Sequence, residues 1–348
     1  MTGFPGFIAA RLVEKLARSE TQFFLLVEPR FVEKAMAAIE EIAEATDTPL
    51  ESFSIVEGDI TQPGLGISDA DLEIIQFETT DVFHLAAAYD LAVPKNIAYN
   101  VNLDGTKNVN DFVCTVKNLR RYNYISTCYV AGKRVGDILE ADLRHNAGFR
   151  NNYEETKYLA EMEVEGLKGT LPVTIFRPSV VVGDSRTGET SKYDGIYYLI
   201  HYLRRAPILL RIMNVGNSDV RLNLVPVDFV VDGIAALAHD KNAVGKTIAL
   251  GDPEPLTTAE LFDAIAKDMT GRKSEFGPPP KFAEWFMNTR ISPLITGLPH
   301  HAVPYFFISQ TYDTSEAERL LAAHDIKCPR FGDYVGNLLD FVDEFPKL

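Results

Sequence analysis

Short apolar segments alternate with helical ones along the first half of this chain, and this alternation restricts the possible folds more than any other feature of the sequence. The apolar runs predict buried strands at residues 23–27, 53–56, 81–87, 121–127 and 172–178. The segments between them predict helices at residues 8–16, 31–45 and 96–117 and around residues 153–157. Together they predict an α/β fold in which a doubly wound parallel sheet is covered by helices on both faces.

The chain opens on a glycine loop, Thr2-Gly3-Phe4-Pro5-Gly6-Phe7-Ile8-Ala9. Two glycines at this spacing let backbone amides approach a pyrophosphate, and the helix that follows presents its positive N-terminal end to it. Alone, such a loop could also be an ordinary turn. In a Rossmann-type fold it lies between the first strand and the first helix, but only Met1 and Thr2 precede Gly3. The first strand is therefore apparently missing, which favours a true start upstream of Met1.

The regular alternation ends near Pro178, which suggests where one part of the chain gives way to another. We expect residues 1–178 to form an N-terminally truncated NAD(P)-binding Rossmann domain, and residues 179–348 to form a smaller substrate-binding lobe. Residues 183–220 show no clean periodicity. Strands at 222–227 and 246–250, with helices at 229–238 and 257–270, predict that the lobe returns in part to the sheet.

The composition argues against several classes of partner. The formal net charge is −15 and no basic run of five or more residues occurs, so no nucleic acid partner is expected. The three cysteines form no C-x-x-C pair and the seven histidines show no metal-binding spacing, so we expect neither a disulfide framework nor a metal site. No signal peptide is visible, and no apolar run reaches the roughly 18 residues of a membrane helix. These features favour a cytoplasmic protein.

Tyr153 and Lys157 are four positions apart, which places them on one face of a helix. This spacing alone is weak evidence, because a surface Tyr–Lys pair on an acidic helix would show it too. A Lys157 ammonium near Tyr153 would lower the phenol pKa from about 10, which would suit Tyr153 as a general acid. Thr127, at the end of a predicted strand, would hydrogen-bond the reacting carbonyl oxygen, with Ser126 as the second candidate. With the glycine loop, these residues predict a hydride-transfer site.

Glu28 and Arg30 follow the predicted strand at residues 23–27 and bear on the choice of cofactor. An acidic side chain at this place can bind the adenosine ribose hydroxyls and favours NAD. A basic side chain can pair with the 2′-phosphate and favours NADP. Both could also be solvated turn residues. The sequence therefore leaves the preference between NADP and NAD open.

Several motifs together resemble the extended short-chain dehydrogenase/reductases. They are Gly3-x-x-Gly6-x-x-Ala9, Gly58-Asp59-Ile60, His84-Leu-Ala-Ala87, Asn102-x-x-Gly105-Thr106, Ser126-Thr127, Tyr153-x-x-x-Lys157 and Arg177-Pro178. Within this superfamily the chain looks most like the thioester reductase and fatty acyl-CoA reductase branch, whose domain is also called male-sterility-like. The stretches that carry this likeness are Phe83-His-Leu-Ala-Ala87, Ile125-Ser-Thr-Cys-Tyr-Val-Ala-Gly132, Arg177-Pro-Ser-Val-Val-Val-Gly-Asp184 and Asn223-Leu-Val-Pro-Val-Asp228.

The resemblance implies a set of cofactor-binding positions. They are Gly3, Phe4, Pro5, Gly6, Phe7, Ile8, Glu28, Arg30, Asp59, Ile60, Ala86, Ala87, Asn102, Tyr153, Lys157 and Pro178. Asp59 would contact the adenine, Ala86 and Ala87 would leave room for the cofactor, and Asn102 would support the active-site backbone. NADPH is the usual donor in this branch, where a basic residue is usual near the second strand's end. Glu28 departs from that pattern.

The leading hypothesis is a reductase in which NADPH or NADH reduces the carbonyl of an acyl thioester or an aldehyde and Tyr153 protonates the oxygen. A thioester substrate would release CoA or an acyl-carrier protein. The alternatives are an NAD-dependent sugar-nucleotide epimerase or dehydratase and a non-catalytic NAD(P)-binding protein. The resemblance to this family also implies a possible homodimer, because dimers are common in it. A membrane-surface helix over residues 282–298 is less favoured than a packed one. Residues Asn223 to Asp228 could contact substrate, or could form a strand followed by an N-cap at Asp228.

Overall fold

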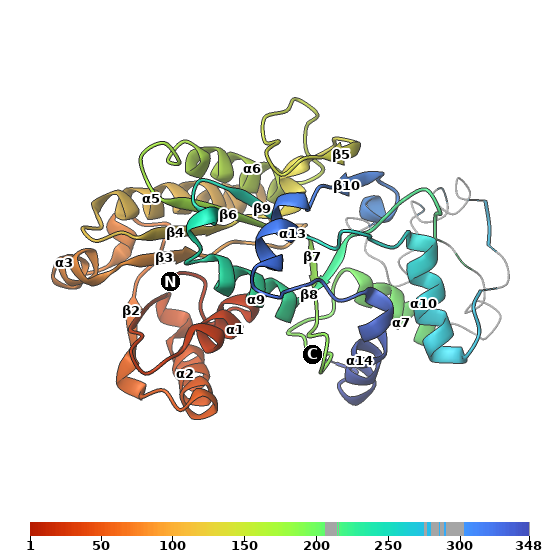
Figure 1. The fold of residues 1–348 in the computed structure, drawn as a ribbon, viewed down its shortest axis with the longest axis horizontal. Coiled ribbons are helices and arrows are strands. Elements are labelled where there is room, and N and C mark those ends of the chain that lie inside the picture. The colour runs from red at the N-terminus through yellow and green to blue at the C-terminus, as the bar shows by residue number, and fades with distance from the viewer. Residues whose placement is uncertain are drawn as a thin grey trace.

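The computed structural model describes residues 1–205, 214, 216–274, 277–279, 285, 289 and 303–347. At its centre is a parallel sheet covered by helices (Figure 1). The strands of this sheet are β1 (Phe23–Val27), β2 (Phe53–Glu57), β3 (Asp81–His84), β4 (Arg121–Ile125), β6 (Val173–Pro178) and β9 (Thr247–Leu250). They pair in the order β2–β1 and β3–β4–β6–β9. The expected α/β fold with a parallel sheet is confirmed.

Met1 and Thr2 lie between β1 and β3, at the position expected for the first strand. Thr2 forms parallel bridges to Leu26 and His84. The backbone N–H of Thr2 donates to the carbonyl of Phe83 over 3.0 Å, and that of Leu26 donates to the carbonyl of Met1 over 2.9 Å. These two residues join the two groups of strands into one sheet.

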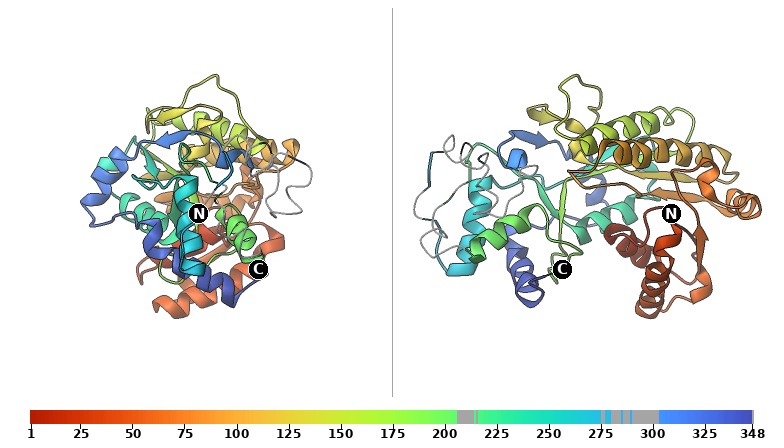
Figure 2. Two further views of the ribbon diagram at one scale, coloured as in Figure 1. Left: turned by 90° about the vertical axis from the view of Figure 1, so that its right-hand side faces the viewer. Right: turned by 180° about the vertical axis from the view of Figure 1, so that it is seen from behind.

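Two layers of helices enclose the sheet, as Figures 1 and 2 show. One layer contains α1 (Phe7–Leu16), α2 (Val32–Thr46) and α9 (Val227–Leu237), and the other contains α5 (Gly105–Thr115) and α6 (Asn152–Glu165). Another helix, α3 (Asp69–Glu78), connects β2 to β3. Side chains alternate between the layers along each strand. Tyr122 and Tyr124 of β4 pack toward α5 and α6, whereas Ile125 packs toward α1 and α9.

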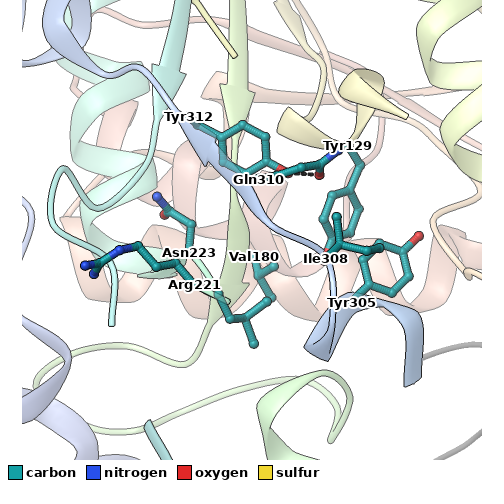
Figure 3. Close-up of a pocket in the computed structure, with 9 residues that line it drawn as sticks. Tyr129, Val180, Arg221, Asn223, Tyr305, Ile308, Gln310 and Tyr312 are labelled. Carbon is teal, nitrogen blue, oxygen red and sulfur yellow. Dashed lines mark hydrogen bonds between the residues drawn. The ribbon is translucent and has the colours of Figure 1, made fainter. Parts of the chain in front are cut away.

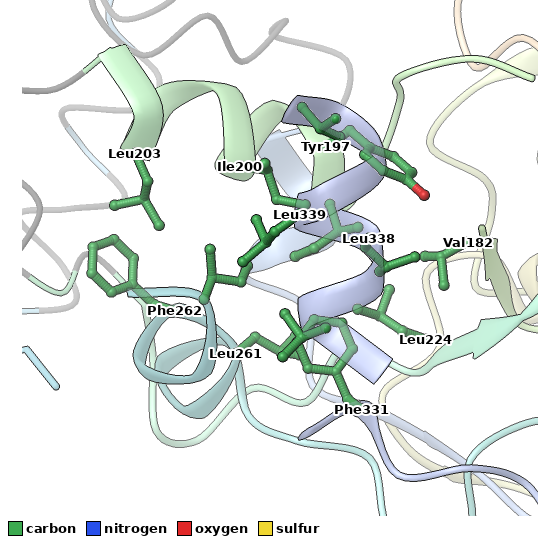
Figure 4. Close-up of a cluster of buried hydrophobic side chains, with 14 of the residues drawn as sticks. Val182, Tyr197, Ile200, Leu203, Leu224, Leu261, Phe262, Phe331, Leu338 and Leu339 are labelled. Atoms are coloured by element: carbon green, nitrogen blue, oxygen red, sulfur yellow. The ribbon is translucent and has the colours of Figure 1, made fainter. Parts of the chain in front are cut away.

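A second apolar core lies beyond the sheet, between three helices (Figure 4). They are α7 (Ile196–Arg205), α10 (Thr258–Thr270) and α14 (Phe331–Glu344). Tyr197 and Ile200 of α7 contact this core, although the sequence from 183 to 220 predicted no helix. Thr257 and Glu260 form a reciprocal capping box that fixes the start of α10. The parallel pair β7 (Val180–Val182) and β8 (Leu224–Pro226) leads from the sheet to this lobe.

The C-terminal part of the chain returns to the sheet region. Strand β10 (Gln310–Tyr312) pairs with β5 (Gly136–Ile138), and helix α13 (Ser315–Ala322) follows. Next to β5, the buried Glu140 carboxylate accepts the backbone N–H groups of Ala249 and Glu316, each at 2.7 Å, and of Ala317 at 3.2 Å. One side chain thus connects β9 and the first turn of α13 to the loop after β5.

Four local predictions were wrong in detail. The strands predicted at 81–87 and 121–127 end earlier, at His84 and Ile125, because the chain turns at the sheet edge to form the site. The single helix predicted at 96–117 is α4 (Lys95–Ala98), a π-helical turn (Tyr99–Asp104) and then α5. Asp228 is not an N-cap: it lies inside α9, and its carboxylate accepts the N–H of Ser185 over 2.8 Å.

The membrane-surface helix weighed for residues 282–298 lies almost wholly outside the described residues. Among the helices that the structure describes, none combines the length and the apolar character needed to cross a membrane.

Candidate active site

The candidate site lies where the carboxyl ends of the parallel strands meet, the usual position of ligands in open α/β sheets. Here β3 leads to Ala86 and Ala87, β4 leads to Ser126 and Thr127, and β6 ends at Pro178. The glycine loop faces the end of β3, since the N–H of Ala86 donates to Thr2 Oγ1 over 3.2 Å. The fold therefore brings together segments that are far apart in the sequence.

The glycine loop has the tight geometry that a dinucleotide cradle requires. Gly3 has a φ of +89°, and a Cβ added there would lie 2.8 Å from the backbone nitrogen of Ala86. A Cβ on Gly6 would lie 2.7 Å from the carbonyl oxygen of Gly3. The loop leads directly into α1, whose N-cap is Gly6. Free N–H groups at the start of a helix bind phosphate well, so these residues fit the cofactor that the sequence implies.

Replacing Gly3 by alanine should destabilise the protein more than the same change at Gly245. Both glycines have positive φ, which costs an alanine about 1–2 kcal/mol. At Gly245 a Cβ would meet nothing within 4 Å, whereas at Gly3 it would overlap backbone atoms of Leu85 and Ala86. Urea denaturation of both variants separates the cost of the positive φ, which both share, from the cost of the steric overlap, which only Gly3 has. Equal losses of stability would contradict the tight packing of this loop.

Thr127 and Tyr153 form the polar pair at the centre of the site. The Thr127 hydroxyl is near enough to Tyr153 to lower the pKa of its phenol, and Thr127 Oγ1 accepts the N–H of Tyr129 over 3.2 Å. Burial raises the pKa of Tyr153 to about 12, against the opposing effect of the Thr127 hydroxyl. The net shift is therefore upward, and the expected lowering of this pKa by Lys157 stays a prediction. A protonated phenol at neutral pH is nevertheless the state that a general acid needs.

Lys157 lies on the buried side of α6. Within the described chain, its Nζ donates to Tyr124 Oη and to the carbonyl of Ile125, both over 2.9 Å. Burial lowers the pKa of Lys157 to about 7, although the Glu161 carboxylate acts in the opposite direction. Lys157 therefore titrates near physiological pH. The sequence did not predict its contact with Tyr124, although Tyr124 stands two residues before Ser126 in the same strand.

Ser126 is not available to a substrate carbonyl, which corrects its place as second candidate. Its hydroxyl is buried and donates to the Glu161 carboxylate. Glu161 is fully buried and pairs with Arg177, whose Nε lies 2.9 Å and Nη2 2.5 Å from Glu161 Oε1. Arg177 Nη1 also donates to the carbonyls of Glu140 and Asp142, each over 3.1 Å. This network forms a structural support below the site.

Glu28 and Arg30 pair with each other at the end of β1. Arg30 Nε lies 2.8 Å from Glu28 Oε2, and the two side chains are 70% and 40% exposed respectively. The Arg30 guanidinium also lies over the ring of Phe31, 4.6 Å from its centroid. An acid and a base therefore stand together where the adenosine ribose would bind, which agrees with a preference left open between NAD and NADP.

The remaining expected cofactor positions line the same sheet edge. Asp59 Oδ1 accepts the N–H of Thr61 over 2.8 Å, and Ile60 is buried against the helix at Gly105. Asn102 Oδ1 accepts the N–H of Ala88 over 2.7 Å, while its Nδ2 donates to the carbonyl of Ala88 and to Thr156 of α6. Asn102 thereby holds the loop after β3 against the helix that carries Tyr153.

A pocket next to the site is bordered largely by residues that the sequence did not single out (Figure 3). They are Tyr129, Val180, Arg221, Leu222, Asn223, Tyr305, Ile308, Gln310 and Tyr312. The rings of Tyr129 and Tyr305 lie 4.6 Å apart. Tyr129 follows Thr127 by two positions, so the pocket adjoins the polar pair. Asn223, expected near substrate, does line it, but its side-chain amide is also paired with the backbone of Asp252.

Tyr305 connects the C-terminal segment to the helix of Tyr153. Its hydroxyl donates to Glu154 Oε1 over 2.6 Å and accepts from Asn151 Nδ2 over 2.7 Å. Glu154 is fully buried and also pairs with Arg150 over 2.8 Å. No local pattern could have identified Tyr305, because it lies about 150 positions from its partners.

Comparison with known proteins gives a consistent assignment. The sequence profile described as male sterility protein matches residues 1–234. The chain belongs to this family. The male sterility family is a branch of the extended short-chain dehydrogenase/reductases that binds NAD(P), as the sequence motifs indicated. In the part of the chain that the structure describes, no group of three or more His, Cys, Asp or Glu is arranged to hold a metal ion.

The relatives of this male sterility domain include named reductases. It is 27% identical over 277 residues to the fatty acyl-CoA reductase wat of Drosophila melanogaster, covering 69% of this chain and 53% of that protein. It is 28% identical over 311 residues to fatty acyl-CoA reductase 1 of Rattus norvegicus, covering 76% of this chain and 60% of that protein. The chain thus spans about half the length of such curated relatives.

Among solved structures, the terminal R domain from the myxalamid PKS-NRPS biosynthetic pathway superposes with a TM-score of 0.82 at 22% identity. The match covers 100% of this chain and 90% of that one. A UDP-glucuronic acid 4-epimerase from Bacillus cereus in complex with NAD gives a TM-score of 0.66 at 19% identity, covering 99% of this chain and 96% of that one. Both likenesses confirm the fold.

Proposed function

We propose that this domain is an NAD(P)H-dependent reductase that acts on the carbonyl of an acyl thioester or an aldehyde. The observation that carries the proposal is that Thr127, at the end of β4, adjoins Tyr153, which shares a helix with Lys157, at the sheet edge that the glycine loop faces. A donor for a developing oxyanion and a protonated acid are what carbonyl reduction requires of a protein. The named fatty acyl-CoA reductases among the relatives support the thioester as substrate.

Each residue then has a distinct task. A bound nicotinamide would supply the hydride. Thr127 orients the substrate carbonyl, and Tyr153 donates its phenolic proton to the carbonyl oxygen. The Lys157 ammonium stabilises the negative charge left on Tyr153. Gly3, Gly6 and the first turn of α1 hold the pyrophosphate, and the aromatic pocket beside Tyr129 receives the acyl part of the substrate.

The same reaction on a thioester releases a thiol. The proposed carriers are CoA and an acyl-carrier protein. The first is in keeping with relatives named acyl-CoA reductases, and the second with the similarity to a thiolation-reductase di-domain from an archaeal non-ribosomal peptide synthetase. A homodimer and a cytoplasmic location remain expectations from the sequence.

The proposal predicts that the purified protein consumes NADPH or NADH when an acyl-CoA is added. The reduced nicotinamide is followed by its absorbance and the free thiol by a colorimetric reagent, for acyl-CoA esters of increasing chain length and for the matching aldehydes. Free fatty acids serve as the control, because they offer no reactive thioester. Comparing the rates with NADPH and with NADH shows which cofactor is preferred. A preference for NADPH would indicate that Arg30 determines the choice, and a preference for NADH would indicate Glu28.

Cofactor binding without reduction of any thioester or aldehyde would contradict the proposal. Retention of tightly bound NAD, with conversion of a UDP-sugar and no net consumption of NADH, would instead support the epimerase alternative.

A further inference from the structure

Tyr305 contacts two segments of the candidate site at once. Its ring packs against that of Tyr129, with centroids 4.6 Å apart (Figure 3). Its hydroxyl bonds to Asn151 and Glu154, which stand on either side of Tyr153 in the sequence. Tyr305 is only 8% exposed, although it comes from the C-terminal part of the chain. One buried side chain thus connects that part to both halves of the site.

The bonds of the Tyr305 hydroxyl have a fixed direction. A carboxylate only accepts, so the hydroxyl donates to Glu154 Oε1 over 2.6 Å. Its oxygen accepts from Asn151 Nδ2 over 2.7 Å, which leaves Asn151 Oδ1 to accept the N–H of Glu154 over 3.0 Å. This last bond is the N-cap of α6. The Tyr305 hydroxyl therefore orients the amide that begins the helix of Tyr153.

Glu154 is held from both sides. It is 0% exposed, and Arg150 supplies its other donors. Arg150 Nη1 donates to Oε1 over 2.8 Å, and the backbone N–H of Arg150 donates to Oε2 over 2.9 Å. The Arg150 guanidinium also lies 5.4 Å from the centroid of the Tyr305 ring. A buried carboxylate with this set of donors keeps one orientation, so the first turn of α6 is fixed between Tyr305 and the loop before the helix.

The ring of Tyr305 supports the other half of the site. Its neighbour Tyr129 follows Thr127 by two positions, and the N–H of Tyr129 donates to Thr127 Oγ1 over 3.2 Å. Both rings line the aromatic pocket. The hydroxyl of Tyr305 thus bears on the segment of Tyr153, and its ring bears on the segment of Thr127 and on the pocket.

We propose that Tyr305 is a positioning residue whose hydroxyl holds the first turn of α6, so that the Tyr153 phenol stands beside Thr127, and whose ring forms a wall of the acyl pocket. This inference rests on the proposed function, because it presumes that Tyr153 and Thr127 act on the substrate carbonyl. A displacement of about 1 Å at a reacting group can lower a rate by about 10²-fold. A residue that donates no proton to the substrate can therefore control kcat.

Tyr305→Phe tests the hydroxyl, because it keeps the ring. We expect kcat for acyl-CoA reduction to fall about tenfold, while KM changes by less than about twofold since the pocket wall remains. Hydrogen–deuterium exchange at the first turn of α6, followed by mass spectrometry, should become about tenfold faster. Tyr305→Leu, which also removes the ring, should in addition raise KM about fivefold.

Asn151→Ser tests the same bond from its other end. Serine keeps an oxygen that can cap α6 but offers no amide donor to Tyr305. It should lower kcat about as much as Tyr305→Phe does. The two changes together should be no worse than Tyr305→Phe alone, because both act through one set of bonds. Losses that multiply in the double variant would overturn the proposal. This variant also keeps the proposal testable if Tyr305→Phe fails to fold.

Tyr334→Phe is the matched control. Tyr334 is a buried tyrosine in the same C-terminal part, and its hydroxyl has no hydrogen-bond partner among the described residues. This variant should keep the kcat, the KM and the exchange rate of the parent. A merely structural role for Tyr305 would lower the thermal stability of Tyr305→Phe and leave kcat and the exchange at α6 unchanged, and that outcome would overturn the proposal.

The proposed function and this inference fail in different ways. Faster exchange at α6 in Tyr305→Phe, in a protein that reduces no thioester or aldehyde, would contradict the function alone. An active reductase in which Tyr305→Phe keeps the kcat of the parent would contradict the inference alone.

Discussion

Replacing Tyr153 by phenylalanine should lower kcat for thioester or aldehyde reduction by about 10²–10⁴-fold. The variant keeps the ring and loses only the hydroxyl, whose pKa burial raises to about 12. With this proton source removed, the oxygen of the reacting carbonyl develops charge with only the Thr127 hydroxyl as a donor and with no acid to protonate it. Steady-state kinetics give the effect on kcat, and a fluorescence titration with NADPH should show nearly unchanged cofactor affinity.

Tyr158→Phe provides the matched control for this experiment. Tyr158 lies on the same helix, and its ring contacts His145 and Phe149 with centroids 4.9 Å and 5.0 Å away, contacts that phenylalanine retains. Its kcat should stay close to that of the parent. If Tyr153→Phe retained most of the activity, Tyr153 would not be the proton donor and the proposed mechanism would be wrong.

Replacing Arg177 by methionine should destabilise the fold by about 3–5 kcal/mol, because it leaves a buried carboxylate without its counter-charge. Glu161 is 0% exposed and Arg177 is 3% exposed. The change also leaves the carbonyls of Glu140 and Asp142 without their donor. Urea denaturation followed by circular dichroism at neutral pH measures the loss.

Two further variants separate charge from packing at Arg177. Adding Glu161→Leu to Arg177→Met should recover part of the stability, since a buried ion pair can often be replaced by apolar side chains. Arg319→Met makes the same exchange in an exposed pair, where Arg319 Nε lies 2.9 Å from Glu316 and is 58% exposed, and it should have a much smaller effect. A small loss in Arg177→Met would show that Glu161 does not depend on this arginine.

The sheet was predictable because its strands are local patterns. Predicted segments such as 23–27 and 172–178 agree with β1 and β6 to within a residue, since continuous apolar runs report burial on both faces. Helix α7 was missed because its tyrosines and histidine obscure the apolar repeat, and its burial depends on α10 and α14. The π-helical turn at Asn102 was also missed, since the bonds that require it come from Ala88 and Thr156.

The site was predictable in its residue types but not in their orientation. The sequence brought Thr127, Tyr153 and Lys157 together, yet it could not show that the hydroxyl of Ser126 turns inward to Glu161. Helix spacing alone predicted that Lys157 lies near Tyr153. The structure shows a further partner of Lys157, the hydroxyl of Tyr124 on β4. Contacts across the sheet decide such details, and a single sequence does not contain them.

The bonds of Glu140 have a consequence for the order in which the chain folds. A ribosome makes this carboxylate long before it makes Ala249, Glu316 and Ala317, whose backbone N–H groups the carboxylate binds. A nascent chain that ends near Pro178 already contains the glycine loop, Tyr153 and Lys157, but its buried acid still lacks these donors. We therefore expect the cofactor-binding half to mature late, after α13 has emerged. Strand β9 and helix α13 are then needed to complete the structure around a site whose own residues are made much earlier.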